Sequence, residues 1–197
     1  MNDIGRFTGS LLLLDADILY PIRVCDFILT ASSLRLLARP VVSERVLVEA
    51  QRNVVADRPN LSQQRIERRF QNVRAATDGH DQAIGELLDN ASIVNPKDRH
   101  VLQAAIHHGV DFIVTNDSHL RREITTWIGQ RLEAGSLRGA VSADDLAHGL
   151  ANESADEVLA VVRAMNDRFH NPTRSMSETL ASLVKSMPSL RVLNPEP

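Results

Sequence analysis

Short apolar segments alternate along this chain with longer stretches of helical periodicity, and this alternation limits the fold more than any other feature of the sequence. Five short apolar segments favour buried β-strands. They cover residues 10–14, 40–42, 91–94, 111–115 and 137–141. Helices are predicted over residues 19–38, 44–54, 63–74, 83–88, 95–109 and 120–133. Strands separated by helices form βαβ units, so residues 1–150 are predicted to form an α/β domain with a parallel sheet covered on both faces.

The strand signal stops after residue 150, and two amphipathic helices are predicted beyond it. In the first, apolar side chains recur at a spacing of three and four residues. They are Ala155, Val158, Val162, Met165 and Phe169. Ser154 with Glu157 and Ser175 with Glu178 have the spacing of capping boxes. We therefore predict that residues 151–197 form a C-terminal helical hairpin, separate from the α/β domain. Its narrow apolar stripe either covers that domain, which we favour, or forms a groove for a partner protein.

Composition excludes several classes of protein. A single cysteine, Cys25, rules out an intramolecular disulfide framework and a cysteine-based zinc site. The longest uninterrupted apolar run is residues 11–14, far short of the roughly 20 residues that a membrane span needs. The first residues lack the basic region of a secretory signal, so a cytoplasmic protein is expected.

The net charge of −3 is small, but the charges are unevenly distributed. Residues 34–75 are rich in arginine, whereas residues 76–157 carry an excess of acids. A basic half beside an acidic half is compatible with a cation site next to a track for a polyanion. The alternative is that both are ordinary solvated faces.

Four acids lie where a parallel sheet would bring them together. Asp15 directly follows the first predicted strand, and Asp117 follows the fourth by two residues. Ligand sites of open parallel sheets lie outside the carboxyl ends of the strands. Glu49 and Asp98 interrupt apolar helical segments, although Asp98 at the third position of a helix opened by Asn95 could simply stabilise the helix end.

Converging carboxylates repel one another unless a cation neutralises them. Hard oxygen ligands without cysteine favour Mg²⁺ or Mn²⁺. The sequence therefore predicts a divalent metal site at this edge of the sheet.

The segments around the four acids resemble the acidic motifs of PIN-domain nucleases. They read LLLLDADIL at Asp15, VLVEAQRN at Glu49, KDRHVLQAA at Asp98 and IVTND at Asp117. Their order and spacing match the family over residues 10–150, and the segment at Asp98 is the most specific. The resemblance implies a three-layer α/β/α sandwich with a five-stranded parallel sheet. It also implies metal-dependent cleavage of RNA phosphodiesters, with the four acids as catalytic metal ligands.

Many members of this family are VapC-type toxins of type II toxin–antitoxin pairs, and residues 151–197 are similar to the helical extension of one subgroup. The resemblance thus implies two partners, an RNA and an antitoxin protein, and leaves open whether the chain forms a homodimer. Few aromatic residues are present to stack on bases, which favours recognition of a structured RNA such as tRNA by shape and charge.

Further residues receive supporting roles in this hypothesis. Thr115 and Asn116 could hydrogen-bond a ligand carboxylate or the attacking water. Asp17 is either a fifth ligand or a turn acid, because the family often has a small polar residue there. Four arginines are the predicted RNA contacts. Arg99 would bind a phosphate that flanks the scissile one, and three arginines would contact the RNA backbone by charge, namely Arg65, Arg68 and Arg69.

Two other functions remain open. A phosphatase of the haloacid dehalogenase type would use Asp15 and Asp17 after one strand and Thr115 after another, but it leaves Glu49 unexplained and lacks a lysine at the expected late position. A catalytically inactive PIN-like scaffold that binds RNA or protein would usually have lost one of the four acids. Three histidines of the helix after Asn95 are expected on its surface. They are His100, His107 and His108.

Overall fold

Three short parallel strands form the sheet of this protein. The computed structural model describes residues 7–80, 94–130, 135–168 and 175–193. The strands are β1 (Leu12–Leu14), β2 (Phe112–Val114) and β3 (Gly139–Val141), in the order β1-β2-β3. The sheet is in register with Leu12 opposite Phe112 and Phe112 opposite Gly139. The side chains of β1 and β2 are almost completely buried, as expected for a parallel sheet covered on both faces.

The prediction of a five-stranded sheet is wrong for the described residues, which are mostly helical with this small sheet at the centre. Residues 40–42 contribute only isolated bridges from Val41 to Leu13 and to Asp78. Pro40 has no N–H to donate to a ladder, and Ser43 already caps the next helix, so too little chain remains for a strand. Of the predicted strand at residues 91–94, only Val94 lies within the described residues.

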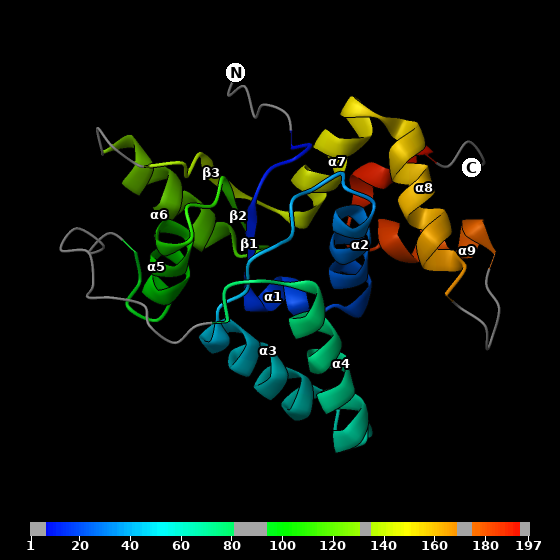
Figure 1. Ribbon diagram of the computed structural model, residues 1–197, viewed down its shortest axis with the longest axis horizontal. Coiled ribbons are helices and arrows are strands. Elements are labelled where there is room, and N and C mark those ends of the chain that lie inside the picture. Colours follow the sequence, from blue (N-terminus) through cyan, green and yellow to red (C-terminus); the bar gives the residue numbers. More distant parts are fainter. Residues whose placement is uncertain (1–6, 81–93, 131–134, 169–174, 194–197) are drawn as a thin grey trace.

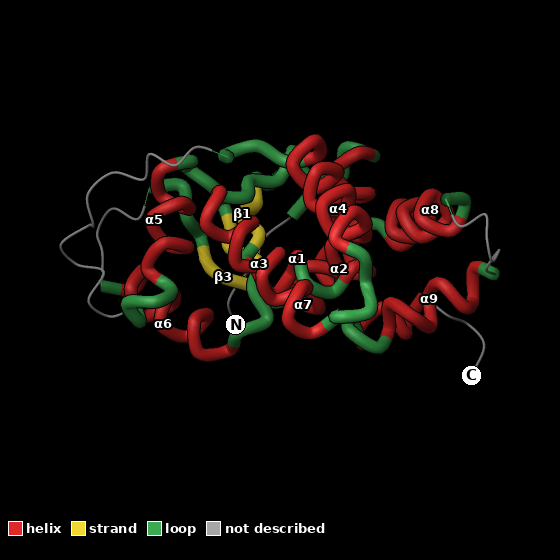
Figure 2. The backbone as a smooth tube through the Cα atoms, turned by 90° about the horizontal axis from the view of Figure 1, so that it is seen from below, coloured by secondary structure: helices red, strands yellow, loops and turns green. Residues whose placement is uncertain are grey.

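Helices lie on both sides of the sheet, with α5 and α6 on one side and α2 and α7 on the other (Figures 1 and 2). The helices of the α/β part are α1 (Ala16–Leu19), α2 (Ile22–Ser33), α3 (Glu44–Asp57), α4 (Gln63–Ala76), α5 (Arg99–His107), α6 (Ser118–Gly129) and α7 (Ala143–Glu153). The helix predicted over residues 19–38 is divided at Pro21, which has no N–H to continue α1. The helix predicted at residues 83–88 lies outside the described residues.

Side-chain caps fix the starts of several helices. The Ser43 hydroxyl accepts a hydrogen bond from the Val46 N–H, and Ser142 with Asp145 forms a capping box at the start of α7. Of the two predicted boxes, Ser175 with Glu178 is present. At Ser154 the hydroxyl accepts from the Glu157 N–H, and the reciprocal hydrogen bond of a capping box is not formed. These caps satisfy backbone N–H groups that the first turn of a helix leaves unpaired.

The C-terminal helices pack onto the α/β part. They are α8 (Ala155–Asn166), α9 (Met176–Val184) and a 3₁₀ helix, η2 (Pro188–Leu193). Helix α8 lies against α2 and α7, and η2 lies against α7 and α9 (Figure 1). Val158, Val162 and Met165 of the predicted stripe are buried, together with Val161. Among the described residues, no helix is both long enough and apolar enough to cross a membrane.

A Gly149→Ala substitution in α7 is expected to destabilise the protein although alanine favours helices. A Cβ at this position would lie 2.3 Å from two ring carbons of the buried Phe7. The centroid of the Phe7 ring is 5.0 Å from that of Phe112, so the two rings pack against each other. Overpacking of this kind costs about 1–3 kcal/mol, against roughly 1 kcal/mol gained in helix propensity. Denaturant unfolding measures the difference.

Gly129→Ala in α6 is the matched control, because no described atom beyond the helix's own backbone lies within 4 Å of the Cβ that it adds. It is expected to be neutral or stabilising. Equal unfolding free energies for the two variants would contradict the packing argument.

Candidate metal and nuclease site

Asp15 and Thr115 join the carboxyl ends of β1 and β2. The backbone N–H of Asp15 donates to the Val114 carbonyl, which continues the pairing of the two strands. The fully buried Thr115 hydroxyl donates to Asp15 Oδ2 at 2.8 Å. Asp15 Oδ1 accepts from the Ala16 N–H at 2.7 Å and so caps α1. The sheet and one buried hydroxyl therefore fix the position of the Asp15 carboxylate.

Asp17 lies in the same site. Its Oδ2 accepts a hydrogen bond from the Asn116 backbone N–H at 2.8 Å and lies 3.3 Å from the Thr115 hydroxyl oxygen. Its Oδ1 is buried and makes no hydrogen bond with the described residues. The Asn116 side chain accepts from the Ala143 N–H at 3.2 Å, which ties the loop after β2 to the start of α7. A buried carboxylate oxygen without a partner needs a proton or a cation.

The other three acids approach this pair from three different helices. Glu49 comes from α3, Asp98 stands at the start of α5 and Asp117 at the start of α6. The negative charge of Asp15 acts on Asp98, and that of Glu49 acts on Asp15. Asp98 also feels the charge of Asp117. These interactions link Glu49 to Asp15, Asp15 to Asp98 and Asp98 to Asp117.

Local structure separates the roles of Asp98 and Asp117. The predicted N-cap, Asn95, is three residues early, because the segment before Arg99 forms turns and Asp98 is the N-cap residue of α5. The Asp98 side chain makes no capping hydrogen bond. By contrast, Asp117 Oδ1 accepts from two backbone N–H groups of α6. Its other oxygen makes neither of these bonds, so Asp117 can cap α6 and still offer an oxygen to a ligand.

Burial makes most of these carboxyls hard to ionise. It raises the pKa of Asp15, against the lowering effect of the Thr115 hydrogen bond. Burial, and then the charge of Asp15, raises the pKa of Asp17 to about 7. Burial also raises the pKa of Asp98, which the neighbouring Lys97 opposes. Burial would act in the same direction on Asp117, but hydrogen bonds from backbone N–H groups hold its pKa below the ordinary value.

The donor set fits a hard divalent cation by its chemistry. In the described part of the chain, no three His, Cys, Asp or Glu side chains stand close enough together to hold one ion as they are placed. Mg²⁺ does not require such a cage, because it usually keeps several waters and binds one or two carboxylates. The unpartnered Oδ1 of Asp17 and the elevated pKa values of Asp15 and Asp98 mark a place where a positive charge would be stabilised.

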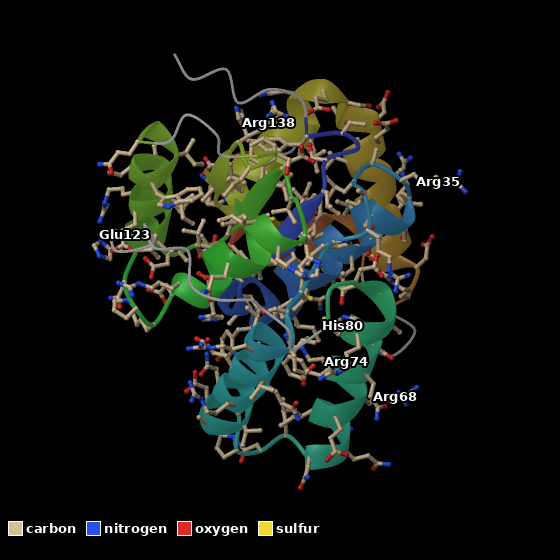
Figure 3. The ribbon with its side chains drawn as sticks, turned by 60° about the vertical axis from the view of Figure 1, so that its left-hand side comes forward. Arg35, Arg68, Arg74, His80, Glu123 and Arg138 are labelled. Carbon is tan, nitrogen blue, oxygen red and sulfur yellow. The ribbon has the colours of Figure 1, made fainter. Side chains whose placement is uncertain are left out.

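The sequence did not reveal three further residues near the acids. His100, expected on the surface of α5, is buried, with its side chain only 4% exposed and its Nε2 3.6 Å from Glu49 Oε2. Glu123 of α6, labelled in Figure 3, accepts from the Asn95 N–H and adds to the charge acting on Asp98. Lys97 Nζ lies 3.9 Å from Asp98 Oδ2. Of these three, only Lys97 could have been inferred from the sequence, because it directly precedes Asp98.

Three of the predicted RNA-binding arginines lie on α4, away from the acids. Arg65, Arg68 and Arg69 line a cavity of about 410 Å³ between α2 and α4. Arg65 and Arg68 are exposed, and Figure 3 shows Arg68 projecting outward from its helix. Arg69 donates to the carbonyls of Leu19 and Tyr20, so its guanidinium helps to hold the end of α1. The fourth, Arg99, donates through Nε to the Val94 carbonyl at 3.0 Å.

Comparison of the chain with models of protein families, with curated proteins and with solved structures gave no significant match. The case for a function therefore rests on the residues and on their arrangement.

Proposed function

We propose that this protein is a metal-dependent ribonuclease of the PIN type. The observation that supports the proposal is the series of charge interactions that links Glu49 to Asp15, Asp15 to Asp98 and Asp98 to Asp117, with Asp15 held directly after β1. A bound Mg²⁺ or Mn²⁺ would lower the pKa of a coordinated water and stabilise charge on the leaving oxygen. In-line attack on a phosphodiester would then give a 5′-phosphate and a 3′-hydroxyl.

The chain's own residues orient the site for this reaction. Thr115 holds Asp15, and the Asn116 backbone N–H holds Asp17, so two carboxylates keep their positions before any ligand arrives. Such preorganisation avoids reorganisation during the reaction. Lys97, beside Asp98, places a cation where a phosphate oxygen of the substrate could be neutralised. The exposed arginines of α4 offer contacts to the RNA backbone by charge alone.

A toxin role in the cytoplasm, with an antitoxin as partner, rests on the resemblance of the acidic motifs and of the C-terminal helices. An antitoxin would silence the enzyme by placing an arginine among the acids, because a guanidinium pairs bidentately with carboxylates. The buried side chains of α8 favour a covering role for the C-terminal helices over a partner groove on that stripe.

Removal of the metal tests the proposal. The full-length protein, incubated with a labelled structured RNA such as tRNA, is expected to cut it in Mg²⁺ or Mn²⁺ and to stop in excess EDTA, with activity restored by added metal. Cleavage that continues undiminished in EDTA would contradict a metal-dependent mechanism.

The same preparation is also given p-nitrophenyl phosphate, a simple phosphomonoester. Hydrolysis of the monoester without cleavage of RNA would instead support the phosphatase. Binding of RNA without cleavage in either metal would support the inactive scaffold.

A further inference from the structure

His100 occupies an unusual position beside the acids. It is the second residue of α5, and its side chain points inward with only 4% of its surface exposed. Its Nδ1 lies 2.8 Å from the Lys97 carbonyl oxygen. Because a carbonyl oxygen only accepts, Nδ1 must carry the hydrogen and donate it. The contact therefore fixes which ring nitrogen is protonated in the neutral imidazole.

The other ring nitrogen, Nε2, then presents a lone pair. It is buried and makes no hydrogen bond with any described residue. The nearest acidic atom is Glu49 Oε2, 3.6 Å away. The Nε2 lone pair and the Glu49 carboxylate oxygen, both electron-pair donors, therefore face each other across 3.6 Å.

This arrangement is the one that histidine ligands of metals adopt. A metal-binding histidine almost always donates one ring N–H to a carbonyl or carboxylate, which orients the ring and frees the other nitrogen for the metal. Ligands about 2.1 Å from an octahedral ion lie about 3 Å apart. The half-exposed Glu49 side chain could close the gap of 3.6 Å by a small rotation. Asp15 is also near enough for its charge to act on both residues.

We propose that His100 Nε2 and Glu49 bind the same divalent ion in the acidic site, and that the nitrogen ligand makes the site prefer Mn²⁺ to Mg²⁺. The inference rests on the proposed function, since it concerns the metal of that site. Mg²⁺ prefers oxygen ligands, whereas transition metals bind imidazole more readily. The four acids alone, which supply only oxygen ligands, would not give this preference for Mn²⁺.

Pulsed electron paramagnetic resonance of the full-length protein loaded with MnCl₂ tests this directly. The wild-type spectrum is expected to show coupling of Mn²⁺ to a ¹⁴N nucleus, which changes when the histidines are labelled with ¹⁵N. The coupling is expected to vanish in His100→Gln. It should persist in His119→Gln, the matched control, because His119 is an exposed histidine beside Glu123 at the same edge of the sheet.

Calorimetric titration gives a second readout. His100→Gln is expected to weaken Mn²⁺ binding at least about tenfold, the lower end of the loss caused by removing even an outer partner of a metal ligand. Mg²⁺ binding should change much less. A thermal melt checks that the variant is folded, and the wild-type spectrum remains decisive if it is not.

The possible outcomes distinguish failure of the His100 ligand from failure of the proposed nuclease function. Bound Mn²⁺ without nitrogen coupling in the wild type overturns the role of His100 and leaves the nuclease standing. Nitrogen coupling that survives in His100→Gln also overturns it. A wild-type protein that binds no Mn²⁺ overturns both the histidine ligand and the metal-dependent nuclease.

Discussion

Replacing Asp15 by asparagine is expected to reduce RNA cleavage by at least about a thousandfold. A metal ion contributes several kcal/mol of transition-state stabilisation, and each 1.36 kcal/mol corresponds to a factor of ten in rate. Asp15 interacts electrostatically with three other acids of the site, Glu49, Asp17 and Asp98. Its loss should therefore weaken metal binding more than the loss of a peripheral acid.

The asparagine variant should remain folded. Its side-chain oxygen can still accept from the Ala16 N–H, which Asp15 Oδ1 accepts at 2.7 Å. Removing one negative charge also relieves repulsion among the acids in the absence of metal. Single-turnover cleavage of labelled RNA, with circular dichroism as the check on folding, measures the effect.

Asp111→Asn is the matched control, because it changes the same residue type on the same sheet. Asp111 directly precedes β2, at the opposite end of the strand from the site, and its Oδ2 accepts from the Leu11 N–H at 2.8 Å. Asparagine can keep this hydrogen bond, so cleavage should be close to that of the wild type. A folded Asp15→Asn variant that cuts RNA as fast as Asp111→Asn would remove Asp15 from the catalytic site.

In the absence of metal, an Asp17→Asn variant is expected to be more stable than the wild type, by an amount that grows with pH. The pKa of Asp17 is about 7 in the folded protein, against 3.8 for an exposed aspartate. The folded state therefore binds the proton more tightly than the unfolded state. The stability that comes from protonated Asp17 is fully present below about pH 4 and is lost as the pH rises to about 7.

Asparagine resembles the protonated carboxyl and does not titrate, so it avoids this loss. The difference in unfolding free energy between variant and wild type should be near zero at pH 4. It should reach the order of a few kcal/mol above pH 7, since each pKa unit corresponds to about 1.4 kcal/mol. Comparing the two proteins removes the contributions of other titrating groups, such as His100, whose lowered pKa acts in the opposite direction.

Denaturant unfolding in EDTA from pH 4 to pH 8 provides the measurement, with the exposed Asp57→Asn as the control that should show no such trend. Added Mg²⁺ should stabilise the wild type at high pH, because a cation compensates the ionised carboxylate. It should therefore reduce the difference in unfolding free energy between the Asp17→Asn variant and the wild type. A gap that stays constant with pH would show that Asp17 is not a buried acid.

The local sequence was sufficient to locate the three strands of the described sheet and the acids that follow two of them. A short apolar run followed by an acid predicts a buried strand and its end from the local sequence alone. Asp15 and Asp117 could therefore be placed after strand ends. The caps at Ser154 and Ser175 were equally predictable, because a cap acts on N–H groups only two or three residues away.

One predicted strand shows where local patterns fail. The predicted strand at residues 40–42 has the apolar character of its neighbours, yet it makes only single bridges from Val41. Forming a strand requires a partner along several residues, and that depends on chain segments distant in the sequence. The arginines of α4 illustrate the same point, since Arg69 is used to hold the carbonyls of Leu19 and Tyr20.

By itself, the sequence determined which acids stand at the ends of secondary-structure elements, because helix and strand signals act over a few neighbouring residues. Three-dimensional packing decided which atoms meet there. It buried His100 against Glu49, left Asp17 Oδ1 without a partner and brought Glu123 from α6 towards Asp98. These contacts join residues tens of positions apart, and they depend on how α3, α5 and α6 pack around the sheet, which no periodicity within a single helix records.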